Sequence, residues 1–436
     1  MKTGIFFNKA NVKINLGLAV TSLLMLGCNE TKDAGTTEIV LNNKSEMQLT
    51  DKAISIKKEL WKGEDNRKKN PLIISGSDTI PSQLNDLDGD GEWDEIFLVT
   101  DFSAQEEKTL QLEWIDESTD YEVRTSVRFG KREAADEPVK PATEETLIAT
   151  DMPKALGFQK YQTDGPTWEN DKVGFRHYLD GRNAKDIFGK KSASISPEDV
   201  GVNDRGEVED DYHQMEDWGR DIFPVGNSVG LGGIALLVDD EVKRMGITVE
   251  DTLNNIKETT FKIVSEGPVK SVLQYEYKAW EASGNSYNVV ETTTIWPGMY
   301  GFKNTVKVNG LTGNEDLLIG LSNINNENPI EEVEIGDWVA LIAHDFQTYE
   351  REWLLGTAIV LPKDSYDGYI EAPQQGNLTD SFLAKIMVEN DSPVSYFAIA
   401  GWEESPDKYF DDPASFKDYV VNQVKQISAD IDLDIK

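Results

Sequence analysis

The sequence predicts a mainly β protein, a large supersandwich-like antiparallel β-sandwich that ends in a C-terminal helix. Three observations favour this fold. Short stretches in which apolar and polar residues alternate recur along the chain, two of these stretches are long and meet at a glycine turn, and only one segment has a clear helical stripe. Many strands with few helices are typical of a packed sandwich rather than of a parallel α/β sheet.

The strand predictions rest on alternation with a period of two residues. Leu273, Tyr275 and Tyr277, for example, alternate with polar residues, as in a half-buried antiparallel strand. The two long strands are expected at 269–279 and 287–296, with a turn at Gly284 and Asn285 between them. Shorter strands are expected at 95–101, 108–115, 121–129, 229–238, 245–249, 338–343, 355–361 and 394–402.

The one predicted helix lies near the C-terminus. Asp412 is a suitable N-cap and Pro413 a suitable first residue. An apolar stripe follows at helical spacing, which indicates a helix docked on the sandwich. The stripe consists of Phe416, Val420, Val424, Ile427 and Ile431.

The N-terminus has the pattern of an export signal. Three lysines precede a short apolar stretch at 14–26, and Gly27 stands directly before Cys28. This junction resembles the lipobox of bacterial lipoproteins, although an ordinary signal peptide remains an alternative. We therefore expect a signal peptide at 1–27, a flexible tether at 28–37 and a single large domain at 38–436. The implied location is the cell envelope, lipid-anchored at the outer membrane, with the periplasmic and the surface side both open.

The composition limits the classes of partner. The chain has 43 Lys and Arg against 79 Asp and Glu, a formal charge of −36, so no nucleic-acid partner is expected. Cys28 is the only cysteine, so no intramolecular disulfide can form and the fold must be held by its core. The lipid anchor is the only contact with a membrane that we expect.

An acidic loop at 85–95 is a candidate metal site. Asp86, Asp88 and Asp90 stand at every second position before Gly91, as in a calcium-binding loop of the EF-hand type, and Asp94 is a fourth candidate ligand. The glutamate expected at the twelfth position is missing, since Phe97 stands there, and Glu95 is a substitute at a different spacing. The choice between a structural calcium site and a plain acidic turn stays open.

The segment 165–191 is locally basic. Residues 172–191 contain six Lys or Arg and two Asp, in contrast to the acidic chain as a whole. Its alternation predicts a strand that places Arg176 and Tyr178 on one face and His177 on the other. Basic side chains beside Trp168 and a tyrosine suit an anionic sugar, while a solvated strand edge protected by lysines is the alternative.

The polar segment 207–233 is rich in aromatic residues. It contains Tyr212, His213 and Trp218, which are suitable for lining a cleft. The chain has three histidines, and we expect His344, which follows an apolar run, to be structural.

These segments together resemble a family of unknown-function domains from polysaccharide-utilisation gene clusters of Gram-negative bacteria. The matching stretches are Ile80-Pro81-Ser82-Gln83-Leu84 with 86–91, Gly165 to Glu169 through Arg176-His177-Tyr178, 186–190, His213, Asp217-Trp218-Gly219 and 225–228. The resemblance covers most of residues 70–310. It implies the dehydration of ulvan oligosaccharides, in which water leaves a terminal uronic acid and an unsaturated uronate remains.

This reaction assigns roles to residues of the two polar segments. His213 is the candidate base, with His177 as its rival; Arg176 or Arg182 neutralises the uronate carboxylate, and Tyr178 or Tyr212 protonates the leaving hydroxyl. No cofactor is required. The predicted catalytic residues are thus His213, Tyr178 and Arg176, and the predicted substrate contacts are Trp168, Glu169, Arg182, Lys190, Tyr212 and Trp218.

Two other functions remain alternatives. A glycoside hydrolase of acidic polysaccharide fragments would use a carboxylate pair such as Glu169 and Asp217, separated by about 5 to 9.5 Å. A non-catalytic glycan-binding lipoprotein would use some of the 10 tryptophans for stacking.

Overall fold

A computed structural model describes residues 36–61, 69–151, 158–248, 250–407 and 410–436. Thr36–Lys436 form one compact unit. Its described residues form several antiparallel sheets and a single α-helix, which confirms the predicted mainly β fold. The signal peptide, Cys28 and most of the tether lie outside the described residues. Within the described residues, no helix is long and apolar enough to span a membrane.

The N-terminal part of the described chain consists of two small sheets that face each other across an apolar core. Ile39, Ile73, Leu98 and Leu110 belong to this core and are fully buried. One sheet has the order β29 (Ile431–Ile435), β1 (Thr37–Asn43), β7 (Glu107–Ile115), β3 (Asn70–Ser75) and β4 (Asp78–Ile80). The other has the order β2 (Leu49–Lys57), β6 (Glu95–Phe102) and β5 (Ser82–Asn85).

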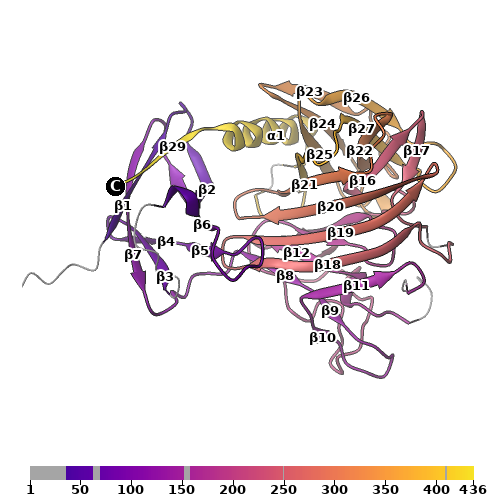
Figure 1. Ribbon diagram of the computed structural model, residues 1–436, viewed down its shortest axis with the longest axis horizontal. Coiled ribbons are helices and arrows are strands. Elements are labelled where there is room, and N and C mark those ends of the chain that lie inside the picture. Colours follow the sequence, from indigo (N-terminus) through magenta and orange to yellow (C-terminus); the bar gives the residue numbers. More distant parts are fainter. Residues whose placement is uncertain (1–35, 62–68, 152–157, 249, 408–409) are drawn as a thin grey trace, which may run out of the picture. The chain divides into compact units, whose positions relative to one another are not determined.

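A nine-stranded sheet is the largest element of the fold (Figure 1). Its long strands β18 to β21 run side by side because their alternating apolar residues all face one core. The order is β11 (Glu144–Ile148), β18 (Ile256–Glu266), β19 (Ser271–Ala282), β20 (Asn285–Ile295), β21 (Gly301–Asn309), β28 (Val394–Trp402), β25 (Leu355–Pro362), β24 (Trp338–Asp345) and β23 (Glu331–Ile335).

Two five-stranded sheets share this core. Trp168 and Phe175 of the first pack on Phe302 of β21, with ring centroids 5.4 and 4.7 Å away. The first sheet has the order β15 (Gly219–Asp221), β14 (Lys185–Lys190), β13 (Gly174–His177), β12 (Thr167–Asn170) and β8 (Thr125–Arg128). The second has the order β17 (Glu241–Arg244), β16 (Leu231–Val238), β22 (Glu315–Ser322), β27 (Ser381–Met387) and β26 (Tyr366–Glu371).

The remaining elements are short. A two-stranded ribbon pairs β9 (Gly130–Lys131) with β10 (Lys140–Pro141). Single 3-10 turns occur at Lys58–Leu60, Gln162–Asp164 and Tyr349–Arg351, and the last of these contributes to the site described below.

The predicted helix is confirmed as α1 (Pro413–Ser428). Asp412 caps it by accepting hydrogen bonds from the backbone N–H groups of Ala414 and Ser415. Phe416, Val420 and Val424 of the predicted stripe are buried. Ile431 is not part of the helix, however: the chain straightens after Ser428, and Ile431 begins β29, which pairs with β1.

Other predicted elements differ from the structure in position. The 121–129 strand is reduced to β8, and the turn between the two long strands is formed by Ser283 and Gly284. The 245–249 strand is wrong as far as it is described. There the backbone N–H of Ile247 bonds to the carbonyl of Gly181, and Gly246 lies against that same carbonyl at a positive φ, so this segment braces a turn and joins no sheet.

Candidate functional site

Three adjacent strands bring charged residues together in the interior. Arg176 of β13 lies opposite Asp186 of β14, and β15 adds Asp221, which is paired with Phe188. The predicted alternation is confirmed: Arg176 and Tyr178 share one face of the sheet, and His177 is on the other. The sheet therefore places two carboxylates around one guanidinium.

Arg176 is fully buried at the centre of this cluster. Its Nη2 donates to Asp221 Oδ2 at 2.8 Å, to the Tyr178 hydroxyl at 2.5 Å and to Asp186. Its Nη1 donates to the carbonyl of Thr163 at 3.3 Å. Arg176 has no exposed surface, and its N–H groups bond to other residues of the protein. It therefore positions those residues and cannot bind a substrate carboxylate.

His213 lies at the surface of the same cluster. Its side chain is 43 % exposed, and its Nδ1 lies 3.4 Å from Asp221 Oδ2, the oxygen that also accepts from Arg176. Burial, and then the charge of Arg176, lower the pKa of His213. A neutral imidazole held from behind by a carboxylate, with its other nitrogen turned away from that carboxylate, is a suitable general base.

The protonation state of Asp221 decides the charge next to His213. Burial, and then the carboxylate of Asp186, raise the pKa of Asp221 to about 8, although Arg176 acts in the opposite direction. Two carboxylates compete for one guanidinium, so one of them retains a proton up to near-neutral pH. Asp221 therefore holds a proton below about pH 8 and backs His213 as a carboxylate once that proton is lost.

Tyr349 contacts His213, and Tyr178 connects the charge cluster to a second arginine. The Tyr349 ring lies edge-on to the imidazole at 5.6 Å, and the Arg182 guanidinium lies 3.7 Å from the centre of the Tyr178 ring. Burial raises the pKa of both tyrosines, so both keep their protons. Arg182 is partly exposed and is held by Asp180 at 2.7 Å. Of the two arginines predicted to meet a carboxylate, Arg182 is the one with accessible surface.

The prediction that the basic side chains of 172–191 meet an anionic sugar is wrong for most of them, because they point into the interior. Lys185 pairs with Glu291 at 2.5 Å, and Lys190 pairs with Glu169 at 2.5 Å, all four being buried. Such pairs lie in the interior because each cation has a carboxylate partner. Lys190 and Glu169 therefore do not present charge to a substrate.

Trp168 does not fit its predicted role either. It has no exposed surface and stacks on Phe175 at 5.9 Å, so it offers no ring face to a sugar. Glu169 accepts hydrogen bonds from Lys190 and from the backbone and hydroxyl of Ser196. Its occupied carboxylate is a poor candidate for the hydrolase pair with Asp217, which is exposed.

The other two histidines are buried. His177 is stacked on Tyr275 at 4.3 Å, and its Nε2 lies 3.3 Å from the Tyr277 hydroxyl. Burial, and then the charge of Lys185, lower its pKa to about 3. His344 contacts the carbonyl of Phe410 at 2.9 Å. Neither imidazole has the exposed nitrogen that a base needs.

Tyr212 contacts His213 and, together with Trp218, lines an open cleft. The Tyr212 ring is 4.7 Å from the imidazole, and its hydroxyl lies 3.0 Å from Asp210 Oδ1. Trp218 is half-buried against Phe188 at 6.0 Å. Both residues line a cleft of about 670 Å³, but Tyr212 is buried, so Trp218 is the accessible one of these two predicted substrate contacts.

Sequence reasoning missed two members of the site. Asp221 stands before the apolar pair Ile222 and Phe223, a context that indicates a buried carboxylate. Nothing in the sequence around Tyr349 indicated the site, because Tyr349 is more than 100 residues from His213 and its loop is brought there by contacts such as the backbone hydrogen bond to the carbonyl of Ile222. Glu350 follows Tyr349 with a φ of 57°, a conformation that non-glycine residues rarely adopt outside constrained sites.

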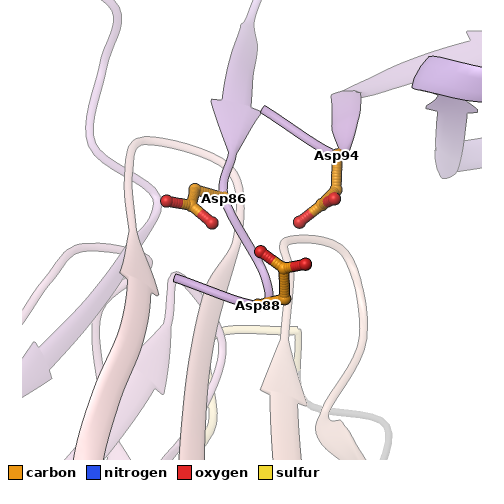
Figure 2. Close-up of side chains that lie close together, drawn as sticks. All are labelled: Asp86, Asp88 and Asp94. Carbon is orange, nitrogen blue, oxygen red and sulfur yellow. The ribbon is translucent and has the colours of Figure 1, made fainter. Parts of the chain in front are cut away.

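The acidic loop brings together three of its four predicted ligands. Figure 2 shows the carboxylates of Asp86, Asp88 and Asp94 turned toward one another, with ligand atoms within 4.8 Å. Asp90 is not among them, since its Oδ1 accepts from the backbone N–H of Glu92 at 2.8 Å. Three carboxylates suit the oxygen preference of calcium, but backbone N–H groups also bond to Asp86 and Asp94, as in a plain acidic turn.

The proposed substitute ligand Glu95 is unavailable. It is buried and bonds to Ser55, Lys57 and Lys270. Burial opposes ionisation, but Lys270 and the other donors prevail and lower the pKa of Glu95 to about 2. Any calcium in this loop would be completed by backbone carbonyls and water.

Calcium binding is tested by thermal unfolding. If the loop binds the ion, millimolar calcium should raise Tm by about 2 °C or more, because a ligand that binds only the folded state stabilises it. Asp88→Asn should abolish the increase. Asp90→Asn is the matched control and should retain it; equal responses of both variants would rule out a site at the three converging carboxylates.

The raised pKa of Asp221 predicts a pH effect on stability. Its contribution is complete below about pH 4 and is lost as pH rises through about 8, because the folded state binds the proton more tightly than the unfolded chain. Asp221→Asn should therefore remove part of the fall in free energy of unfolding over this range. Urea unfolding across pH checks this, with the exposed Asp217→Asn as control; parallel curves for wild type and Asp221→Asn would contradict it.

The chain is a member of the Domain of unknown function (DUF4861) family, whose model matches residues 41–433. The predicted resemblance to a family of unknown-function domains is confirmed at this level, and the match also includes the C-terminal third. The chain is 24 % identical over 373 residues to Uncharacterized protein P7 of Formosa agariphila, covering 82 % of each.

Two solved structures have a similar arrangement. One is a protein in the glycosyl hydrolase family 38 from Enterococcus faecalis, with 11 % identity and a TM-score of 0.43 over 92 % of this chain and 47 % of that one. The other is an alpha-mannosidase from Enterococcus faecalis V583, with 10 % identity and a TM-score of 0.42 over 92 % and 46 %. The chain spans about half the length of both.

Proposed function

We propose that the protein is a carbohydrate-active lyase that eliminates water from the terminal uronic acid of ulvan-type acidic oligosaccharides. The observation that carries this proposal is the exposed His213, which is backed by Asp221 and in ring contact with Tyr349; Tyr178 and Arg182 belong to the same charge cluster. A base, a cation and protonated tyrosines are the groups that such an elimination needs.

In the proposed reaction the C5–H and C4–O bonds of the uronate break and a C4–C5 double bond forms. His213 takes the C5 proton, and a protonated tyrosine gives its proton to the leaving hydroxyl, which departs as water. Arg182 neutralises the carboxylate, which stabilises the charge that develops when C5 loses its proton. The reaction needs no cofactor.

Tyr178, Tyr212 and Tyr349 are candidates for the acid that protonates the leaving hydroxyl, but Tyr212 is buried and its hydroxyl is bonded to Asp210. The Tyr178 hydroxyl is engaged by Arg176 at 2.5 Å, whereas the Tyr349 hydroxyl has no hydrogen-bond partner among the described residues. Tyr349 is also in ring contact with His213. We therefore assign Tyr349 as the acid and Tyr178 as the residue that orients Arg182.

One assay tests the function. The purified protein is incubated with uronate-terminated ulvan oligosaccharides, and mass and ultraviolet absorbance are followed. Loss of one water with new absorbance from the conjugated double bond supports the elimination. Cleavage into shorter sugars would favour the hydrolase, and binding without any change would favour a glycan-binding module.

Substitution of the partly exposed Arg182 tests whether this residue binds the substrate carboxylate. Arg182→Ala should lower kcat/KM about 10- to 100-fold, since a charge-assisted bidentate contact is lost, and Arg182→Lys should recover only part of it. The exposed Lys257→Ala is the charge-matched control. Unchanged kinetics of Arg182→Ala would show that another group binds the carboxylate.

A further inference from the structure

The charged residues that line the cleft near His213 are mainly acidic, so the cleft has the same sign of charge as an acidic substrate. We call it the acidic cleft; its volume is about 670 Å³, within the range of small-molecule sites. Its charged lining consists of five acidic residues and one arginine. These are Asp199, Asp204, Glu209, Asp211, Glu216 and Arg205.

The walls of the acidic cleft are fixed by hydrogen bonds from the sheet beneath them. Gln162 Nε2 donates to the carbonyls of Glu198 and Val200 at 2.9 and 2.8 Å, and Arg128 donates to the carbonyl of Pro197 at 2.6 Å. The backbone N–H of Glu209 bonds to the carbonyl of Gly201. The cleft is thus built into the fold and needs no ordering when a ligand enters.

The acidic cleft is adjacent to the candidate base through one shared residue, although His213 itself does not line it. Tyr212 lines it and also contacts the His213 ring, and Trp218 contributes a half-buried ring to the same wall. Arg182, by contrast, does not line the cleft. If the uronate lies at His213, the next sugar would lie in the cleft against the half-buried ring of Trp218, since Tyr212 is itself buried.

Carboxylates and an indole recognise a particular kind of sugar. Carboxylates accept hydrogen bonds from hydroxyl groups, and an aromatic ring packs on the apolar face of a pyranose. The same carboxylates repel a sulfate or a second carboxylate, because like charges facing each other oppose binding. One arginine among five acids does not reverse this.

We infer that the acidic cleft is the subsite for a neutral, unsulfated sugar next to the terminal uronate, and that it rejects a sulfated one. The orientation of the chain in this inference rests on the proposed function. A consequence is that, where the neighbouring sugar carries a sulfate ester, hydrolysis of that ester must precede the elimination.

The test compares one set of ulvan-derived, uronate-terminated oligosaccharides before and after treatment with a sulfatase. The desulfated substrates should have kcat/KM about tenfold higher or more, and the ratio should shrink at high salt, which screens the repulsion. Glu216→Gln with Asp211→Asn should shrink the ratio as well. Trp218→Ala should raise KM for the desulfated substrates, and the exposed Glu113→Gln in β7 should change neither.

Binding measured by calorimetry separates this inference from the proposed function. If neither substrate loses water, the proposed function fails, but tighter binding of the desulfated oligosaccharides, dependent on Glu216 and Trp218, would still support the subsite. Equal or tighter binding of the sulfated oligosaccharides would overturn it. A preference for desulfated sugar that Glu216→Gln with Asp211→Asn leaves intact would overturn it too.

Discussion

His213→Ala should lower the rate of elimination about 100- to 10,000-fold, the usual contribution of a positioned base. His213 is the exposed member of the pair with Asp221, and its neutral form is favoured because burial and Arg176 lower its pKa. The loss should be in kcat rather than KM, because the base acts on the C5 proton in the transition state. Initial rates by ultraviolet absorbance check this.

The neighbouring Gln214 provides the matched control. Gln214→Ala changes an exposed residue of the same loop and should retain wild-type rates and stability. A His213→Ala protein that keeps both its fold and its rate would show that the base lies elsewhere.

His177 is then the residue to compare. It is fully buried with a pKa of about 3, so His177→Asn is expected to reduce stability while the folded fraction keeps its rate. A fall in the rate per folded molecule, with stability unchanged, would indicate that His177 is the base instead of His213.

Local sequence patterns predicted most of the fold. Alternation located the strands that form the long hairpin of β19 and β20, and the Asp412 cap located the start of α1. Patterns failed where distant backbone decides the structure. The residues after β17 have the composition of a strand, but a carbonyl of the 180–183 turn takes their N–H group.

The site was predicted only in part, again because distant residues decide its structure. The segments that carry Arg176 and His213 were found because their residue types are unusual in this chain. The environment of the basic residues was not predicted, because their partners are distant in sequence. Asp221 lies 45 residues from Arg176, and Glu291 lies 106 residues from Lys185. A cluster of cations in sequence is a surface patch only when its counterions lie elsewhere, and a sequence does not show where they lie.

The buried charge cluster gives the second large expected effect. Arg176→Met should lower the free energy of unfolding by about 3–5 kcal/mol, because it leaves the buried carboxylates of Asp186 and Asp221 without their cation. The loss should grow with pH. In acid the carboxylates can take protons in both proteins. As pH rises through about 8, the wild-type Asp221 ionises beside Arg176, whereas the variant must either keep that proton or bury an uncompensated charge.

Urea unfolding at pH 5, 7 and 9 measures this effect. Arg176→Met with Asp221→Asn should regain part of the lost stability, chiefly at pH 9, because the amide cannot ionise. Arg176→Lys keeps the charge but loses the fork, so its loss should be smaller and depend less on pH; it also allows a measurement if Arg176→Met does not fold. A loss in Arg176→Lys that is independent of pH would mean that Arg176 acts through packing on Tyr178 and Phe188 rather than through charge, since its guanidinium lies 4.2 and 5.3 Å from their ring centres.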